Sequence, residues 1–161
     1  MLTFTYMNKN EKEKFLPQLF DLLYDNMREI APTELSYEQE KEQWLGNVSP
    51  ALDKPARQVM ICFADDELIG YIQYYTSDKL LMIEELQLKR EYHCTLTFYR
   101  FCKHFIGTLS AGIESVEAFA DKRNINSQKL MQKLGMKLID SNSNFVHLRG
   151  NANEIINRFT K

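Results

Sequence analysis

The first part of the chain changes from an alternating to a helical apolar pattern. Leu2, Phe4 and Tyr6 alternate with the residues between them, which predicts a short strand. The residues that follow form one apolar stripe at spacings of three and four, which predicts an amphipathic helix. The stripe consists of Phe15, Leu16, Leu19, Phe20, Leu23 and Met27. Pro32 ends this helical region, because the residue before a proline avoids helical geometry.

A second helix follows in this pattern. The Ser36 hydroxyl is suited to capping a helix, so we expect a helix from Tyr37 to about Gly46. The segment from Asn47 to Pro55 contains two prolines and is predicted to be a loop.

Strands and helices alternate through the rest of the chain. Residues 58–64 and 68–75 are predicted strands of a hairpin around Asp65-Asp66-Glu67. The later predicted elements are a strand at 79–88, a helix from Thr95 to about residue 109, a strand at 113–120, a helix from 126 or 127 to 134, strands at 136–140 and 145–148, and a short helix at 152–159. Gly135 stands where a helix end tolerates positive φ. This order predicts a layered α/β fold, and the hairpins make its central sheet mixed.

Composition narrows the class of protein. A chain of 161 residues is long enough for one domain, 1–161, with a real core. The formal net charge of -2 gives no reason to expect nucleic acid or an acidic membrane as partner. Three cysteines without C-x-x-C spacing argue against a disulfide framework or a metal site and suggest a cytoplasmic protein. No signal peptide or membrane-spanning stretch is visible.

The most informative segment is residues 124–136, which directly follow the predicted strand 113–120. It reads N-I-N-S-Q-K-L-M-Q-K-L-G-M, with Asn124, a small residue at Ser127, and Lys133-Leu134-Gly135 before an apolar residue. This pattern resembles the C-terminal signature of the GNAT N-acetyltransferase superfamily, N-x-x-(small)-x-x-L-Y-x-K-L-G-F. The resemblance implies the three-layer GNAT fold, a mixed sheet flanked by helices. It also implies acetyl-CoA as co-substrate, and a cofactor role for Asn124 and Ser127.

The same resemblance places the pyrophosphate site in the turn before the Thr95 helix. Family members have Q/R-x-x-G-x-G/A there, and the backbone N–H groups of the turn and helix hold the diphosphate. The matching segment is His93, Cys94, Thr95, Leu96, Thr97 and Phe98, so neither glycine is present. Two interpretations stay open. The loop takes a different path and binds phosphate with Thr95, Thr97 and nearby His93, Lys89 or Arg90, or it is an ordinary turn and CoA does not bind tightly.

Catalytic groups are implied on the strand 79–88. The backbone at Leu86 and Leu88 matches the positions that hold the pantetheine arm. Glu84 lies two residues before Leu86, and strict alternation puts it on the same face, where family members use a carboxylate to accept the proton of the amine. Glu85 points the other way unless a bulge intervenes, which reverses the assignment. Met131 replaces the family tyrosine that protonates the leaving thiolate.

Aromatic residues are candidates for the acceptor side. Tyr24, Tyr37, Tyr71 and Tyr74 fall on elements that line the acceptor groove in GNAT folds. The resulting hypothesis is an N-acetyltransferase that acts on a primary amine of a small molecule or peptide, with Glu84 as proton acceptor. The alternatives are a GNAT-fold binding or regulatory module without acetyl transfer, and an enzyme with another acyl donor. The family resemblance also allows a homodimer.

Overall fold

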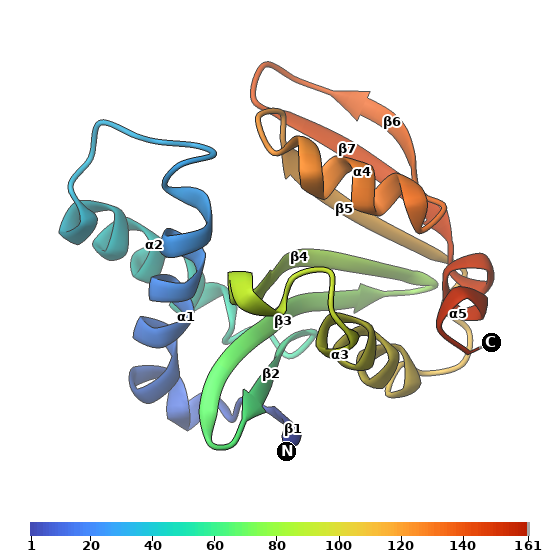
Figure 1. The fold of residues 1–161 in the computed structure, drawn as a ribbon, viewed down its shortest axis with the longest axis horizontal. Coiled ribbons are helices and arrows are strands. Elements are labelled where there is room, and N and C mark those ends of the chain that lie inside the picture. The colour runs from blue at the N-terminus through green and yellow to red at the C-terminus, as the bar shows by residue number, and fades with distance from the viewer. Residues whose placement is uncertain (161) are drawn as a thin grey trace.

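One mixed sheet organises the computed structural model, which describes residues 1–160 (Figure 1). Its strands are β1 Leu2–Tyr6, β2 Arg57–Ala64, β3 Glu67–Ser77, β4 Leu80–Leu88, β5 Ser115–Asp121, β6 Lys137–Ser141 and β7 Phe145–Asn151. Their order across the sheet is β1-β2-β3-β4-β5-β7-β6. Only β4 and β5 pair in parallel among the described strands.

Helices cover both faces of this sheet. They are α1 Lys12–Met27, α2 Tyr37–Ala51, α3 Leu96–Gly107, α4 Ile125–Lys133 and α5 Ala152–Thr160, with short 3-10 turns η1 Lys9–Glu11 and η2 Arg90–Tyr92. α1 and α2 pack on one face, and α3 and α5 pack on the other. The predicted three-layer α/β fold is therefore confirmed. No helix within residues 1–160 has both the length and the apolarity to cross a membrane.

Two hydrophobic cores follow from the alternation of side chains along the strands. On β2, Val59 and Ile61 belong to the core under α1 and α2. Met60 and Cys62 belong to the core under α3 and α5. The centre of β2 is buried on both faces, so its sequence is a continuous apolar run rather than an alternating one.

The predicted hairpin is confirmed, and one predicted loop is wrong in part. Asp65 and Asp66 have φ of 46° and 70°, as a tight turn between right-twisted strands requires. α2 continues to Ala51, although a loop was expected from Asn47 onward. The apolar side of the helix extends one turn further, because Val48 packs on the same core as Trp44. Pro50 lies one residue before the helix ends and removes one backbone N–H donor there.

Candidate active site

β4 and β5 pair along only part of their length. Their parallel ladder joins Leu80–Ile83 to Ser115–Ala118, and beyond it β4 continues to Leu88 without a described partner strand on that side. β5 continues to Asp121 paired with β7 alone. The two strands diverge beyond their shared ladder (Figure 1). The fork between them leaves one backbone edge of residues 84–88 without a strand partner, at the positions predicted to hold the pantetheine arm.

A β-bulge at Glu84 decides which side chains face which way. Gln73 of β3 pairs with Glu85, while the next residue, Tyr74, pairs with Ile83, so Glu84 is the extra residue. Leu86 and Leu88 pack into the α3 core. Glu84 instead bonds to Gln73, and Glu85 bonds to Gln87, on the opposite face. The expectation that Glu84 shares a face with Leu86 and Leu88 is therefore wrong, because the bulge places both glutamates on the α1 side.

The two glutamates differ in their partners. Arg57 donates from Nε to Oε1 of Glu84 at 2.8 Å, and its Nη2 lies 2.8 Å from the same oxygen. Gln73 donates to the second oxygen of Glu84 at 2.9 Å. Both oxygens of Glu84 are thus engaged, and the charge of this carboxylate is compensated by a guanidinium.

Glu85 has an amide partner and no cation among its described contacts. Gln87 donates to Glu85 at 2.7 Å, and Asn26 of α1 donates to Gln87 at 2.8 Å and to the carbonyl of Leu88 at 2.9 Å. Burial, and secondarily the negative charge of Glu84, raise the pKa of Glu85 to about 7, against the opposing effect of the Gln87 hydrogen bond. A carboxyl group with this pKa can accept a proton near neutral pH.

The turn before α3 adopts a left-handed conformation without glycine. Cys94 has φ of 56°, so a residue with a side chain carries the conformation that glycine would accept more readily. Thr95 caps α3: its hydroxyl accepts from the N–H of Thr97 at 3.2 Å and donates to the carbonyl of Tyr92 at 2.6 Å. Leu96 is 71% exposed, and Phe98 packs against the α3 core. Neither of these two bulky side chains therefore lies over the N-terminus of α3. The N–H groups of the first turn have no acceptor within the helix.

The other polar groups expected near this turn are directed elsewhere. Lys89 forms an ion pair with Glu67, and Arg90 donates to the carbonyl of Asp25 at 2.6 Å. The His93 ring lies with Nε2 2.6 Å from the carbonyl oxygen of Leu88. These three side chains fix η2 against its surroundings. The Thr95 hydroxyl already donates to Tyr92 and the N–H of Thr97 to Thr95, so neither of these two donors is free.

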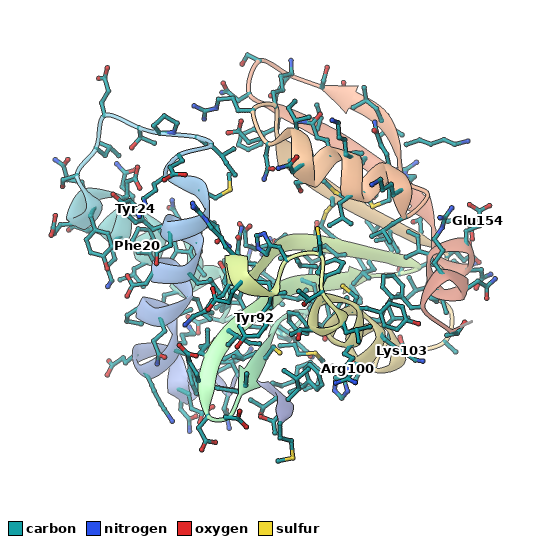
Figure 2. All side chains as sticks on the ribbon, in the orientation of Figure 1. Phe20, Tyr24, Tyr92, Arg100, Lys103 and Glu154 are labelled. Carbon is teal, nitrogen blue, oxygen red and sulfur yellow. The ribbon has the colours of Figure 1, made fainter. Side chains whose placement is uncertain are left out.

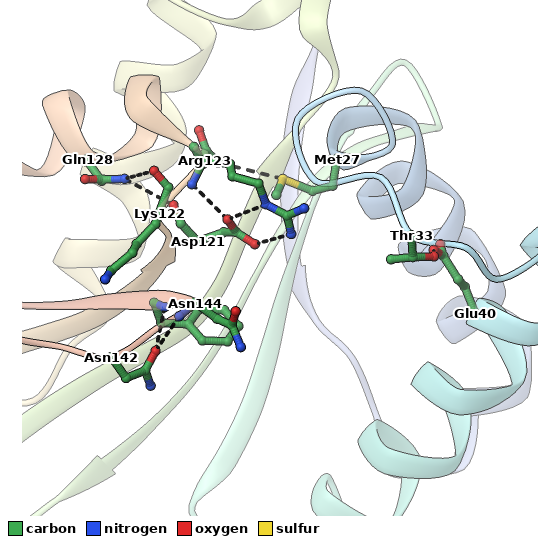
Figure 3. Close-up of polar contacts among 11 residues, drawn as sticks. Met27, Thr33, Glu40, Asp121, Lys122, Arg123, Gln128, Asn142 and Asn144 are labelled. Atoms are coloured by element: carbon green, nitrogen blue, oxygen red, sulfur yellow. Dashed lines mark hydrogen bonds and ion pairs between the residues drawn. The ribbon is translucent and has the colours of Figure 1, made fainter.

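Asn124 and Ser127 lie at the start of α4, across the fork from α1. The Asn124 carbonyl oxygen accepts from the N–H of Ser127 at 3.1 Å and so caps α4. Its amide nitrogen lies 3.7 Å from the sulfur of Met27, at the end of α1 (Figure 3). Met131 packs against the α3 core.

The four candidate tyrosines do not come together. Tyr24 and Tyr37 form an edge-to-face pair with ring centroids 5.0 Å apart, in a cluster that includes Phe20. Figure 2 shows Phe20 and Tyr24 where α1 meets α2. Tyr71 is fully buried under α1, and its hydroxyl has no described hydrogen-bond partner. Tyr74 packs edge-to-face on Phe105 in the α3 core, so it lies on the opposite face from Tyr71 and does not join the others.

A comparison with protein-family models shows which family this chain belongs to. The model of the acetyltransferase (GNAT) domain matches residues 12–137, which is most of the chain. The chain belongs to the GNAT acetyltransferase family. This confirms the resemblance found in residues 124–136 and identifies the chain as an acetyltransferase. No curated protein matches the sequence.

Solved structures share the GNAT fold at low sequence identity. PaiA N-acetyltransferase from Thermoplasma acidophilum, in complex with coenzyme A, is 17% identical, with 94% of this chain and 99% of that chain covered and a TM-score of 0.68. An acetyltransferase from Thermus thermophilus is 13% identical, with coverages of 94% and 97% and a TM-score of 0.72. The ribosomal-protein-S18-alanine N-acetyltransferase from Escherichia coli is 8% identical, with 94% of both chains covered and a TM-score of 0.64.

Sequence reasoning missed the polar residues that distinguish the two glutamates of this GNAT domain. Gln73 is buried on β3 and Gln87 on β4, and Asn26 is buried on α1. Polar residues in such positions need hydrogen-bond partners, and this requirement was the available signal. Arg57, at the start of β2, offered no such signal, because its pairing with Glu84 depends on the bulge.

Proposed function

We propose that this GNAT domain transfers the acetyl group of acetyl-CoA to a primary amine of a small molecule, or of a peptide, with Glu85 as the proton acceptor. Acetyl-CoA would supply a thioester carbonyl: the amine nitrogen forms a bond to this carbon, the C–S bond breaks, and the thiolate leaves and is protonated by water. The proton of the attacking amine passes to a carboxylate oxygen of Glu85. Met131 has no proton to give, so no side chain at its position takes part in the last protonation.

The fork between β4 and β5 carries this proposal. It combines the edge of β4 that has no strand partner with the N-terminus of α3 at the end of the same strand. On this edge the Leu86 backbone would hydrogen-bond an amide-containing arm, whereas the Leu88 carbonyl is already contacted by Asn26 and His93. A helix N-terminus favours a phosphate group through its free N–H groups and its dipole. Exposure of Leu96 supports the same assignment, because that side chain leaves the first turn accessible. The backbone of His93 to Phe98 would hold the diphosphate, and Asn124 and Ser127 would lie near the other end of the cofactor.

Glu85 is a better proton acceptor than Glu84 on the same strand. Proton transfer needs a carboxylate whose pKa is near the working pH and whose oxygen is not committed to a cation. Arg57 and Gln73 engage both oxygens of Glu84, whereas Glu85 is bonded to an amide and has a raised pKa. Strict alternation assigns the proton-accepting role to Glu84. The bulge brings Glu84 to the face of Glu85, where Arg57 and Gln73 engage it, and Glu85 takes that role in this proposal.

Release of free CoA from acetyl-CoA in the presence of amines tests this assignment, with Glu84→Gln as the matched control for Glu85→Gln. We expect E85Q to lower kcat about 100-fold or more, the usual effect of removing a general base, and E84Q to lower it less than about tenfold. Acetyl-CoA affinity should change little in either variant. A larger loss in E84Q would return the role to Glu84, and equal small losses would remove both from proton transfer.

A further inference from the structure

An aromatic patch lies exposed on the face of the sheet that carries Glu84 and Glu85. It consists of Phe119 on β5 with Phe145 and His147 on β7. Val116, Ala118 and Ala120 point into the α3 core, so Phe119 points the opposite way. Phe119 is 53% exposed and Phe145 is 45% exposed. Neighbouring large apolar side chains left open in this way mark a binding surface.

Neighbouring side chains on β5 and β7 restrict the motion of the aromatic patch. The Phe119 ring stacks on the His147 ring with centroids 4.2 Å apart and planes at 18°. Glu117 is only 4% exposed, and Arg149 donates to it from Nε at 3.1 Å and from Nη2 at 2.8 Å. His147 Nε2 lies 3.0 Å from the same oxygen of Glu117 but forms no hydrogen bond among the described residues. One face of the Phe119 ring is therefore fixed, and a fixed aromatic ring can stack a second ring at little entropic cost.

Strand register places this patch beside the proposed proton acceptor. Ala118 pairs with Ile83 as the last rung of the β4–β5 ladder. The next residues are Phe119 on β5 and Glu84 on β4, and the bulge turns Glu85 to the same face. Adjacent strands lie about 4.8 Å apart where they pair and diverge beyond the ladder, so Phe119 is the first residue on the β5 side of the fork and Glu85 the second on the β4 side.

Charge pairing on this face leaves Glu85, beside the fork, without a cation. Five carboxylates lie on it: Glu84, Glu85, Glu117, Asp121 and Asp140, which pairs with His147. Arginines pair with three of them, Arg57 with Glu84, Arg149 with Glu117, and Arg123 with Asp121. Figure 3 shows the Asp121–Arg123 pair. Among the described contacts Glu85 and Asp140 have no cationic partner. Glu85 is the one of the two on β4, at the fork, and a substrate ammonium group would pair with it there.

We propose that the acceptor is an arylalkylamine, with its aromatic ring on Phe119 and its primary amine at Glu85, joined by a short carbon chain. Phe119 is then a specificity-determining residue of the acceptor site. This inference rests on the proposed acetyl transfer and names its substrate class. In the bound state the ammonium group gives one proton to Glu85, which releases it to water. The neutral nitrogen then bonds to the thioester carbon as the C–S bond breaks, and its second proton passes to Glu85 as described above.

Steady-state acetylation of 2-phenylethylamine and of hexylamine tests the inference in the parent protein, Phe119→Ala, Phe119→Trp and Leu138→Ala. Leu138 is the matched control, because it is 55% exposed on β6 but pairs with Leu148, on the other face of the sheet. We expect the parent to prefer 2-phenylethylamine by about tenfold in kcat/KM, the effect of one good aromatic contact. F119A should remove that preference mainly through KM, and F119W and L138A should keep it.

Binding of 2-phenylethylamine, followed by saturation-transfer NMR, separates failure of this inference from failure of the transferase. Acetylation of hexylamine and 2-phenylethylamine with equal efficiency, unaffected by F119A, would overturn the arylalkylamine class and leave the transferase standing. If no amine is acetylated but 2-phenylethylamine binds the parent and not F119A, the ligand class stands and the transferase fails. Absence of both binding and preference overturns the inference.

Discussion

Gln87 donates a 2.7 Å hydrogen bond to Glu85, and the same side chain accepts one of 2.8 Å from Asn26. This chain of amides connects α1 to the proposed proton acceptor and fixes the carboxyl group without supplying a positive charge. An arginine in place of Gln87 would lower the pKa of Glu85, whereas the amide leaves burial as the largest effect on it. The pKa of about 7 is therefore caused mainly by burial, which the Gln87 hydrogen bond opposes only in part.

Stability should depend on pH through Glu85. Its folded pKa, about 7, is above the ordinary value of 4.5, so the folded state binds its proton more tightly than the unfolded state does. Its protonation therefore stabilises the fold at low pH, and this contribution is lost as pH rises from about 4.5 through 7. Glu85→Gln removes the titration and should gain about 1–3 kcal/mol over the parent at pH 8 relative to pH 4. Urea unfolding of both proteins at the two pH values measures this difference, and a constant difference contradicts it.

Cys94 should respond to substitution according to its positive φ. Cys94→Gly relieves the left-handed strain and should stabilise the fold by about 0.5–1 kcal/mol, after the entropy that glycine adds to the unfolded chain. Cys94→Val should destabilise it by about 1–2 kcal/mol, because a β-branched side chain resists this conformation. Thermal unfolding measures both variants. Equal effects would mean that the turn does not hold this backbone conformation in solution.

Charge at Leu96 should control cofactor binding without disturbing the fold. The side chain is exposed at the first position of α3. Leu96→Glu places a negative charge where the diphosphate is proposed to bind and should weaken acetyl-CoA binding at least about tenfold, since like charges repel in the first turn. Leu96→Lys is the matched control and should not weaken it. Glutamate suits a helix N-terminus, so L96E should unfold no earlier than the parent. Equal acetyl-CoA affinity in L96E and L96K would place the diphosphate elsewhere.

Much of the fold follows from short-range patterns in the sequence. The turn at Asp65-Asp66, the Ser36 and Thr95 caps and the positive φ of Gly135 are local effects of residue chemistry, and the structure has them all. The end of α2 was misplaced because Pro50 suggested a loop, whereas packing of Val48 on the core continues the helix. Tertiary contacts overrode a local signal there.

The candidate site was less predictable because one bulge reorganises it. Alternation gives the correct face for Leu86 and Leu88, but an inserted residue in the β3–β4 ladder turns Glu84 away from them. No single-residue propensity in this segment announces the bulge. The guanidinium partner of Glu84 comes from a residue 27 positions away, so the difference between the two carboxylates arises only in the folded chain.

Isothermal titration of the protein with acetyl-CoA tests most directly whether the α3 N-terminus and the free edge of β4 form a cofactor site without the family glycines. We predict one binding site per chain, with a Kd of about 1–100 μM, that is weakened in L96E and retained in C94G. No heat of binding at millimolar acetyl-CoA, in a protein that unfolds cooperatively, would contradict the account.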